Sequence, residues 1–299
     1  IKEVIYRRVY KYMGPVLSKE RPSTKAIRLL SYNVEWGFLT VPDDVTSDSC
    51  GHVIPHTPVA QNTHLTLISK NIGISNPDIC FLQEIGSISA LEYIANSLTT
   101  LFSLHYSIYY SNGPDSGNQG VGLLIKTELM PECAITTIPN FKLNRAVGVI
   151  ITFAGTEYKL IGVHLKSLYD QKIQKDEKEQ EEQIQSVLDW VGDSTNVIFC
   201  GDFNNIPSSG PIKKVTDAGY LDILSSDKYI ANITGNTNTE FHGHPGKESG
   251  SRIDYIFKSA SVNLISSHII DFQRESPIIN PELRGESSDH LPIMGIFSL

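Results

Sequence analysis

The sequence predicts one mixed α/β domain built on two packed β-sheets, and three observations support this. Short apolar runs of strand length recur along the chain. Amphipathic helical stretches fall between some of them. The 299 residues show no internal repeat at a solenoid period, and a β-sandwich enzyme of this size is often a single domain.

The apolar runs predict strands along the whole chain, at Ile27–Tyr32, Ile79–Leu82, Tyr106–Tyr110, Val121–Ile125, Val147–Phe153, Tyr158–Val163, Val197–Cys200, Ile253–Phe257 and Leu291–Phe297. Helical periodicity predicts helices over Val59–Ile72, Ser89–Leu101 and Asp170–Val191, with Gly192 as the C-terminal cap of the last one. Leu39–Pro58 and Thr234–Gly250 are rich in Gly, Pro, Asp, Asn and His and lack periodicity. They are predicted to be long surface loops, which often carry function.

Residues 1–25 form a basic N-terminal arm, and residues 26–299 are expected to be the folded domain. The arm carries Lys2, Arg7, Arg8, Lys11, Lys19, Arg21 and Lys25 against Glu3 and Glu20. It could contact phosphate or a membrane, or it could be a solvated terminal segment. The chain opens neither with Met nor with a signal-peptide pattern, which indicates a mature or shortened form.

Composition limits the classes of function. The net charge of −8 argues against a large surface that coats DNA non-specifically, but it permits a metal site built from carboxylates, and it leaves small or lipid phosphates open. Apolar runs are too short to cross a bilayer. Cys80 and Cys200 lie in apolar runs and are expected to be buried thiols. No zinc-type spacing exists, so the cysteines favour a reducing, intracellular compartment only weakly, and the compartment stays open.

The informative pattern is that several apolar strands are bordered, at their end or at their start, by one acid, amide or histidine. These residues are Asn33, Glu84, His164, Asp202 with Asn204, Asp254, and Asp289 with His290. If neighbouring strands present these ends on one rim, carboxylates, amides and imidazoles converge. Each has an ordinary explanation on its own, since Asn33 could cap a turn, His164 could be a core histidine, and Gly201–Asn204 could be a turn. The conjunction of all six sites favours a catalytic centre.

The residues at these strand ends resemble the motifs of the endonuclease/exonuclease/phosphatase superfamily. Its members include DNase I-like and exonuclease III-like nucleases, poly(A) deadenylases, sphingomyelinases and inositol phosphatases. The resemblance runs from about Ala26 to Leu299, and it rests on Ser31–Val34, Leu82–Glu84, Val163–Leu165, Gly201–Asn204, Ile253–Tyr255 and Ser288–Pro292. It implies a four-layer sandwich of two mixed β-sheets flanked by helices, with the site at one end of the facing sheets.

The chemistry of a phosphodiester suggests roles for these residues. Mg²⁺ prefers oxygen ligands, so Glu84 is the first expected ligand, with Asn33 beside it and Asp289 next; Mn²⁺ or Ca²⁺ would also fit. His290 is expected to act as general base or as a donor to a phosphate oxygen. The resemblance implies that Asp254 holds the other ring nitrogen of His290.

Further roles follow from the resemblance alone. It implies that Asp202 orients or deprotonates the attacking water and that Asn204 donates to the transition-state oxyanion. It implies that His164 contacts the phosphate or acts near the leaving group. Arg145 is similar to a phosphate-contacting arginine of some relatives, or it could be an exposed edge residue, and the same holds for Lys166.

One departure from the family pattern concerns His164. In DNase I-like nucleases its counterpart pairs with an acid from an earlier strand end, whereas this chain offers Asn112 there. The sequence therefore favours a phosphate-binding role for His164 over that of a carboxylate-activated general acid.

The resulting prediction is a divalent-metal-dependent phosphodiester hydrolase, a monomeric nuclease that acts on DNA or RNA. One alternative is the same chemistry on a phospholipid, sphingomyelin, an inositol phosphate or another small phosphoester. A lipid hydrolase should expose an apolar hairpin near the site, for which Trp36–Leu39 is the candidate. The alternative of another class is an inactive binding protein on the same fold. The sequence leaves DNA versus RNA, endo versus exo cleavage and the number of metals open.

Overall fold

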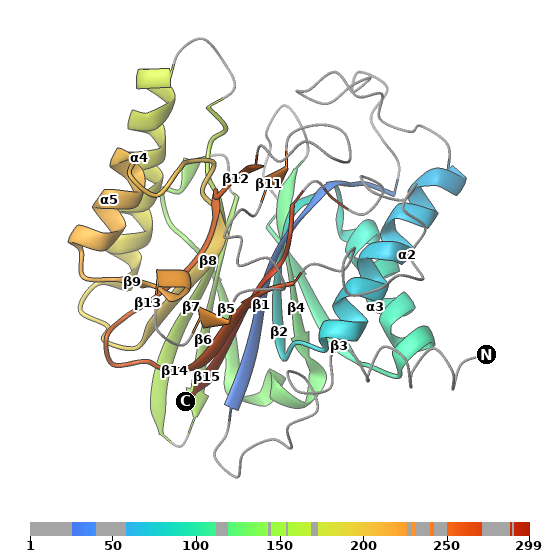
Figure 1. Cartoon of the computed structure of the whole chain (residues 1–299). Helices are drawn as coiled ribbons and strands as arrows, with labels where there is room; N and C mark the ends of the chain where they lie inside the picture. Colours follow the sequence, from blue (N-terminus) through green and yellow to red (C-terminus); the bar gives the residue numbers. More distant parts are fainter. Residues whose placement is uncertain are drawn as a thin grey trace.

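The computed structural model is a four-layer sandwich in which two β-sheets pack face to face and helices cover both outer faces (Figure 1). It describes residues 26–39, 58–111, 119–142, 145–153, 155–168, 173–225, 229–230, 240–241, 250–270, 288 and 290–299. The predicted fold class is confirmed. No helix of the described ranges is both long enough and apolar enough to span a bilayer.

The first sheet has seven strands in the order β10-β14-β15-β1-β2-β4-β3, and the second has six in the order β5-β6-β7-β8-β13-β9. In the first sheet β1 pairs in parallel with β2 and antiparallel with β15. In the second sheet β8 pairs in parallel with β7 and antiparallel with β13. The strands of the first sheet are β1 Ala26–Gly37, β2 Ile79–Ile85, β3 Tyr106–Tyr110, β4 Gly120–Lys126, β10 Tyr229–Ile230, β14 Asn263–Ile269 and β15 Ile293–Ser298.

The strands of the second sheet are β5 Cys133–Thr137, β6 Ala146–Phe153, β7 Thr156–His164, β8 Val197–Asp202, β9 Leu221–Asp222 and β13 Asp254–Lys258. A separate pair is formed by β11 Glu240–Phe241 and β12 Gly250–Ser251. The helices are α2 Pro58–Ser75, α3 Ile88–Phe102, α4 Ile173–Val191 and α5 Gly210–Asp217, with the 3₁₀ turns η1 Thr127–Glu132 and η3 Ile223–Ser225.

Three apolar clusters hold the layers together. The central one lies between the sheets and includes Leu29, Phe81 and Cys200. A second packs the outer face of the seven-stranded sheet against α2 and α3, and a third packs α4 and α5 against the six-stranded sheet. Because strand residues alternate between the two faces, long strands such as β1, β2 and β8 contribute both to the central cluster and to one outer cluster. The near-continuous apolar runs of the sequence are explained by this burial on both faces.

The predicted strands and the three predicted helices are all present, with ends shifted by a few residues. The burial expected for Cys80 and Cys200 is confirmed, since both are fully buried. Pro292, which lacks an N–H, precedes β15, and this accounts for a start two residues later than predicted.

Several elements lay outside the sequence prediction, including the two-residue strands β9 and β10. β5 is short and pairs only with β6, β14 carries Ser266, Ser267 and His268 in place of an apolar run, and α5 has only eight residues. β11 and the first residue of β12 fall in Thr234–Gly250, which was predicted to be loop throughout, so that prediction was wrong for these residues. Two-residue strands of this kind are held by pairing with each other and have no apolar pattern of their own.

Candidate functional site

The polar residues at the strand ends continue the faces that form the central cluster. Along β8, Ile198 and Cys200 point between the sheets, and Asp202 follows at the same alternation. Asp254 stands in the same relation to Ile256 in β13. The site is therefore the end of the inter-sheet core, where the apolar side chains give way to polar ones.

Asp202 lies at the centre of this group. In register it is flanked by His164 on β7 and by Asp254 on β13. Its Oδ2 accepts a hydrogen bond from Asn33 Nδ2 at 3.0 Å, which comes from the opposite sheet. Its Oδ1 accepts from the backbone N–H of Asn204 at 2.7 Å. Both oxygens of this buried side chain therefore accept hydrogen bonds.

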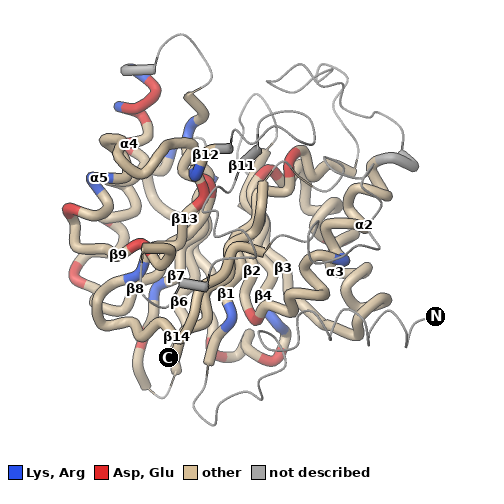
Figure 2. Tube along the Cα trace, viewed as in Figure 1, with Lys and Arg blue, Asp and Glu red and all other residues tan. Residues whose placement is uncertain are grey.

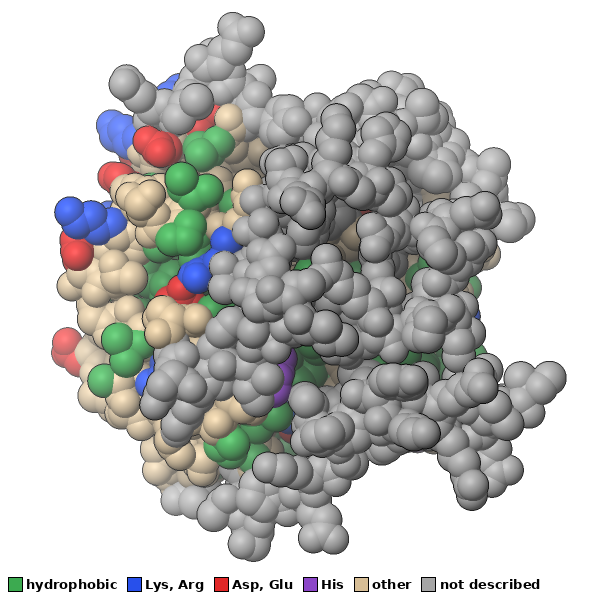
Figure 3. Space-filling model, in the orientation of Figure 1, with side chains coloured by type: hydrophobic (Ala, Val, Ile, Leu, Met, Phe, Trp, Pro, Cys, Tyr) green, Lys and Arg blue, Asp and Glu red, His purple; other side chains and the backbone are tan. Residues whose placement is uncertain are grey.

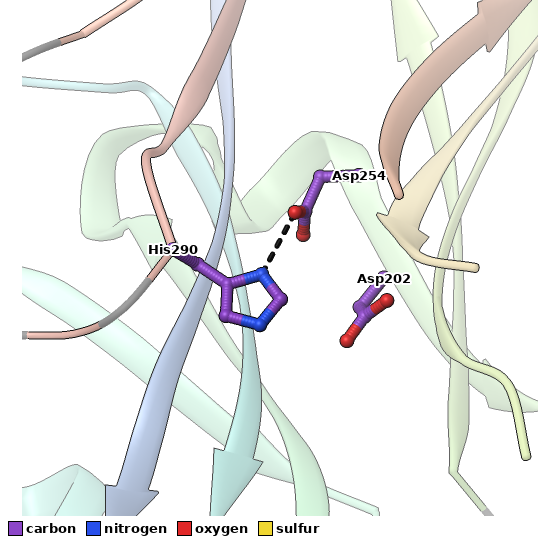
Figure 4. A group of neighbouring side chains, drawn as sticks. All are labelled: Asp202, Asp254 and His290. Atoms are coloured by element: carbon purple, nitrogen blue, oxygen red, sulfur yellow. Dashed lines mark hydrogen bonds and ion pairs between the residues drawn. The ribbon is translucent and has the colours of Figure 1, made fainter. Parts of the chain in front are cut away.

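Asp254 and His290 form a buried dyad beside Asp202 (Figure 4). The Oδ2 of Asp254 lies 2.8 Å from Nδ1 of His290. One ligand atom from each of Asp202, Asp254 and His290 can be chosen so that all lie within 4.8 Å of one another. Ser288 supports the dyad, because its Oγ accepts from the His290 N–H at 2.9 Å and donates to the backbone oxygen of Asn33 at 2.7 Å.

Glu84 reaches the site through an unusual backbone conformation. Alternation along β2 would put it on the α2/α3 side with Cys80 and Leu82. Its φ of 63° breaks that alternation, and its Oε1 instead accepts from Asn33 Nδ2 at 3.2 Å. Trp36, with φ of 54°, lies in the facing irregularity of β1 and donates its backbone N–H to Glu84 Oε2 at 3.1 Å. Non-glycine residues with positive φ are uncommon and gather at functional sites.

Gln119 is a site residue that the sequence analysis missed. Its Nε2 donates to Glu84 Oε2 at 3.0 Å, so this oxygen has a side-chain donor as well as the Trp36 N–H. Gln119 precedes β4, whose Gly120 pairs with Ile85. Gln119 comes before its strand and does not follow an apolar run, so the sequence pattern did not single it out. The antiparallel pairing of β4 with β2 brings it to the rim.

His164 lies on the other side of Asp202. It is almost fully buried, and its Nε2 is 3.6 Å from Asp202 Oδ2 and 3.9 Å from Glu84 Oε1. Burial first, and then the charges of Arg145 and His290, hold the pKa of His164 well below its usual value. Its Nδ1 is buried and has no hydrogen-bond partner within the described ranges. Asn112, the expected counterpart of the family's acid, lies outside those ranges.

Three further predicted residues lie next to the ends of β7 and β8 in the chain or through a hydrogen bond. Asn204 has φ of 49°, and its Nδ2 donates to the oxygen of Leu165 at 3.1 Å, which ties the end of β8 to the end of β7. The backbone oxygen of Arg145 accepts from the His164 N–H at 2.9 Å. Lys166 follows two residues after His164 and is partly buried.

Some predictions fall on residues that the structure does not describe. These are Asp289, the basic arm 1–25, residues 40–57 of the first loop, and most of the second. Trp36–Leu39, the candidate for the exposed apolar hairpin of a lipid hydrolase, lies within the described residues and does not form such an exposed segment. Phe38 is buried and stacks on Trp36, and Leu39 packs against the α2/α3 cluster.

The donor set at this rim fits a divalent cation. Carboxylates of Glu84 and Asp202 both contact one amide, that of Asn33, and Asp254 lies across the strand pair from Asp202. Such oxygens are the ligands that Mg²⁺ prefers. Asp and Glu segments lie at the same end of both sheets (Figure 2). Buried carboxylates at this spacing repel one another unless a cation compensates them.

Comparisons with known proteins found a matching family model and similar solved structures. A family model described as the endonuclease/exonuclease/phosphatase family matches residues 30–290. Among curated proteins no match was found. A solved structure of an endonuclease/exonuclease/phosphatase family protein from Leptotrichia buccalis C-1013-b is similar with a TM-score of 0.63 at 16% identity, covering 91% of this chain and 100% of that one.

Two further solved structures share the fold. One is D. rerio TDP2 complexed with a single-strand DNA product, with a TM-score of 0.59 at 19% identity, covering 92% of this chain and 100% of that one. The other is ANGEL2, a 2′,3′-cyclic phosphatase in complex with adenosine-2′,3′-vanadate, with a TM-score of 0.60 at 17% identity, covering 93% of this chain and 97% of that one. At these identities the likeness establishes the fold.

Proposed function

The chain belongs to the endonuclease/exonuclease/phosphatase family, and we propose that it is a divalent-metal-dependent phosphodiester hydrolase that acts on nucleic acid. The observation that carries this proposal is the position of Asp202. It contacts Asn33 of the opposite sheet and lies between His164 and the Asp254–His290 dyad. Hydrolysis at phosphorus needs a cation-binding site, an acid that orients water and a proton acceptor close together. These residues would supply all three.

Glu84 and Asn33 would hold the cation, with Asp289 as a further ligand. When bound, a divalent cation polarises a phosphoryl oxygen and offsets the negative charge of the substrate. The carboxylate of Glu84 suits this role because the Trp36 N–H and Gln119 fix its Oε2, while its Oε1 lies on the Asn33 side.

The chain's own residues would carry the proton and hold the phosphate. Asp202 orients the attacking water, and Nε2 of His290 accepts the water's proton as the new P–O bond forms. The P–O bond to the leaving group breaks as the new one forms, and the leaving oxygen takes a proton from solvent. Asp254 holds the Nδ1–H of His290 and stabilises the imidazolium that results. Asn204 donates to the developing oxyanion, and the neutral His164 donates a ring N–H to a phosphate oxygen, beside Arg145 and Lys166.

Two observations favour nucleic acid over lipid as the substrate. The similar structures include one with a single-strand DNA product and one with an adenosine vanadate. The candidate for a membrane-entering hairpin has Phe38 turned into the core.

The lowered pKa of His164 favours a neutral phosphate-binding ring over a protonated general acid.

Hydrolysis of bis(p-nitrophenyl) phosphate tests the reaction. We expect turnover that needs added Mg²⁺ and that Asp202→Ala and His290→Ala each reduce by about a hundredfold or more. Asp189→Ala, on the exposed face of α4, is the matched control and should keep parental turnover. A folded parent chain without turnover on any phosphoester would support the inactive binding protein instead.

A substrate panel tests the second half of the proposal. Single-stranded DNA, duplex DNA, poly(A), sphingomyelin and inositol phosphates are compared at one Mg²⁺ concentration. We expect the highest kcat/KM on one of the nucleic acids. Turnover confined to the lipid or inositol substrates would overturn the nucleic-acid assignment and leave the mechanism standing.

A further inference from the structure

We propose that Gln180 and Gln183 of α4 are positioning residues, which hold the backbone of Lys166 and Asn204 where a substrate phosphate would meet them. The inference rests on the proposed function for what these two segments do. It goes beyond that function by assigning a role to a helix that contributes no residue to the rim.

The inner face of α4 changes character along its length. Toward its C-terminal end, Ile184, Val187 and Val191 pack on the six-stranded sheet. One turn earlier the same face carries Gln180 and Gln183, both fully buried. Three residues apart on a helix, they are neighbours on one face. Figure 1 shows α4 on the outer face of this sheet, and Figure 3 shows charges of both signs interspersed with other side chains over α4 and α5.

The inner face of α4 changes from apolar residues to glutamines where β7 and β8 end. Beyond those ends the chain leaves the sheet, and its backbone groups lose their strand partners. Buried backbone groups need hydrogen bonds, and long amides supply a donor and an acceptor together. Apolar residues at 180 and 183 would leave these groups without that partner.

Gln183 holds the segments of Lys166 and Lys142. Its Oε1 accepts the backbone N–H of Lys166 at 2.9 Å. Its Nε2 donates to the backbone oxygen of Lys142 at 3.1 Å, in the segment that leads to Arg145. Gln183 therefore links the two segments that carry the candidate phosphate-binding cations.

Gln180 reaches both segments. Its Nε2 donates to the oxygen of Lys166 at 2.6 Å and lies 3.3 and 3.4 Å from the oxygens of Phe203 and Asn204. Its Oε1 accepts from Asn205 Nδ2 at 3.0 Å. The backbone of Lys166 is thus held at its N–H by one glutamine and at its oxygen by the other.

This division predicts different kinetic effects for the two residues. Loss of the Gln183 amide should disturb Lys166 and raise KM, because Lys166 is proposed to bind the substrate phosphate. Loss of the Gln180 amide should also move Asn204, which is proposed to act on the oxyanion, and should lower kcat. Displacements of about 1 Å at such groups can cost up to roughly a hundredfold in rate.

The experiment compares Gln180→Met and Gln183→Met, which keep the side-chain length, with Gln185→Met. Gln185 is exposed on the same helix and hydrogen-bonds to the exposed Asp189, so it is the matched control. We expect KM to rise about tenfold in Gln183→Met and kcat to fall about tenfold or more in Gln180→Met, with neither changed in the control. Parental kcat and KM in both variants would overturn the proposal.

Double variants separate positioning from a general loss of structure. If Gln183 acts through Lys166, Gln183→Met should not raise KM further in a Lys166→Ala background, and Gln180→Met should lower kcat less in an Asn204→Ala background. Independent effects that multiply would assign the glutamines a purely structural role and overturn the proposal.

Amide hydrogen exchange gives a readout that does not need turnover. The peptides that span residues 164–168 and 203–206 should exchange faster in Gln180→Met and Gln183→Met than in the parent and in Gln185→Met. Unchanged exchange in these peptides overturns the positioning role whatever the substrate is. Faster exchange in a protein that turns over no phosphoester would instead reject the proposed function and leave the positioning contact standing.

Discussion

Asp254 and His290 join the two sheets of the sandwich through one short hydrogen bond. Asp254 begins β13 of the six-stranded sheet, while His290 lies just before β15 of the seven-stranded sheet, and their side-chain atoms are 2.8 Å apart. Neither strand pairs with the other, so only the packing of the two sheets sets this distance. The tautomer of a histidine is fixed by the partner of its other ring nitrogen, and here that partner depends on the whole fold.

Asp254→Asn tests the dyad. An asparagine amide that donates to Nδ1 leaves the proton of the ring on Nε2, which then cannot accept a proton from water. We expect kcat to fall by about 10²- to 10⁴-fold with little change in KM. Steady-state kinetics on bis(p-nitrophenyl) phosphate measures it, with Asp189→Asn as the control and thermal melting as the check on folding. A kcat within about threefold of the parent would rule the dyad out as the proton acceptor.

Glu84→Gln tests the cation seat. The neutral amide removes a charge from the expected ligand at nearly constant volume, so Mg²⁺ affinity should fall about a hundredfold. Calorimetric titration of Mg²⁺ and the Mg²⁺ dependence of turnover both report it. In the parent, EDTA should stop turnover and excess Mg²⁺ should restore it. Equal Mg²⁺ affinity in parent and variant would remove Glu84 from the ligand set.

Gln119→Met tests the support of Glu84 by a residue that touches no substrate. The substitution removes the 3.0 Å hydrogen bond to Glu84 Oε2, an oxygen that also accepts from the Trp36 N–H. Second-layer contacts of this kind cost about 10- to 100-fold in metal affinity when lost. We expect weaker Mg²⁺ binding by calorimetry, with Gln185→Met unchanged. The prediction fails if both variants bind Mg²⁺ as the parent does.

Gly201→Ala tests whether the backbone conformation just before Asp202 requires a glycine. Gly201 has φ of +144°, and a Cβ there would meet the oxygen of Val163 at 1.9 Å. Since the obstacle is the backbone of the neighbouring strand, we expect the free energy of unfolding to fall by about 3 kcal/mol or more. Gly219→Ala, at φ of +90° with open space around it, is the control and should cost about 1 kcal/mol. Urea denaturation measures both, and equal losses would contradict the steric argument.

His268 should make stability depend on pH. Burial lowers its pKa from 6.5 to about 4. Below pH 6.5 His268 becomes protonated in the unfolded chain but stays neutral in the folded chain. The stability that is present above pH 6.5 is therefore lost as the pH falls toward 4. The loss in free energy of unfolding reaches about 3 kcal/mol once the pH is below the folded-state pKa. His268→Gln, which does not titrate, should flatten the urea-unfolding free energy between pH 6.5 and 4. Parallel pH profiles for parent and variant would contradict the prediction.

The strand-end residues stand out in the sequence because each one borders or interrupts an apolar run. Asn33, Asp202 and Asp254 keep the alternation of the inter-sheet face, so their direction follows from their position in the strand. Glu84 does not, since a positive φ turns it out of that pattern. Gln119, Gln180 and Gln183 gave no signal, because an amide before a strand or within a polar helix looks like ordinary surface.

The sequence by itself determined which chemical groups are present, which strands carry them and the kind of reaction they suit. These properties are local, because an apolar run of alternating burial and the residue that ends it lie within a few positions of each other. Tertiary structure decided the rest: the Asp254–His290 distance, the approach of Glu84 to Asn33 and the glutamine contacts under Lys166. Each joins segments far apart in the chain, and such contacts exist only once two sheets and a helix have packed together.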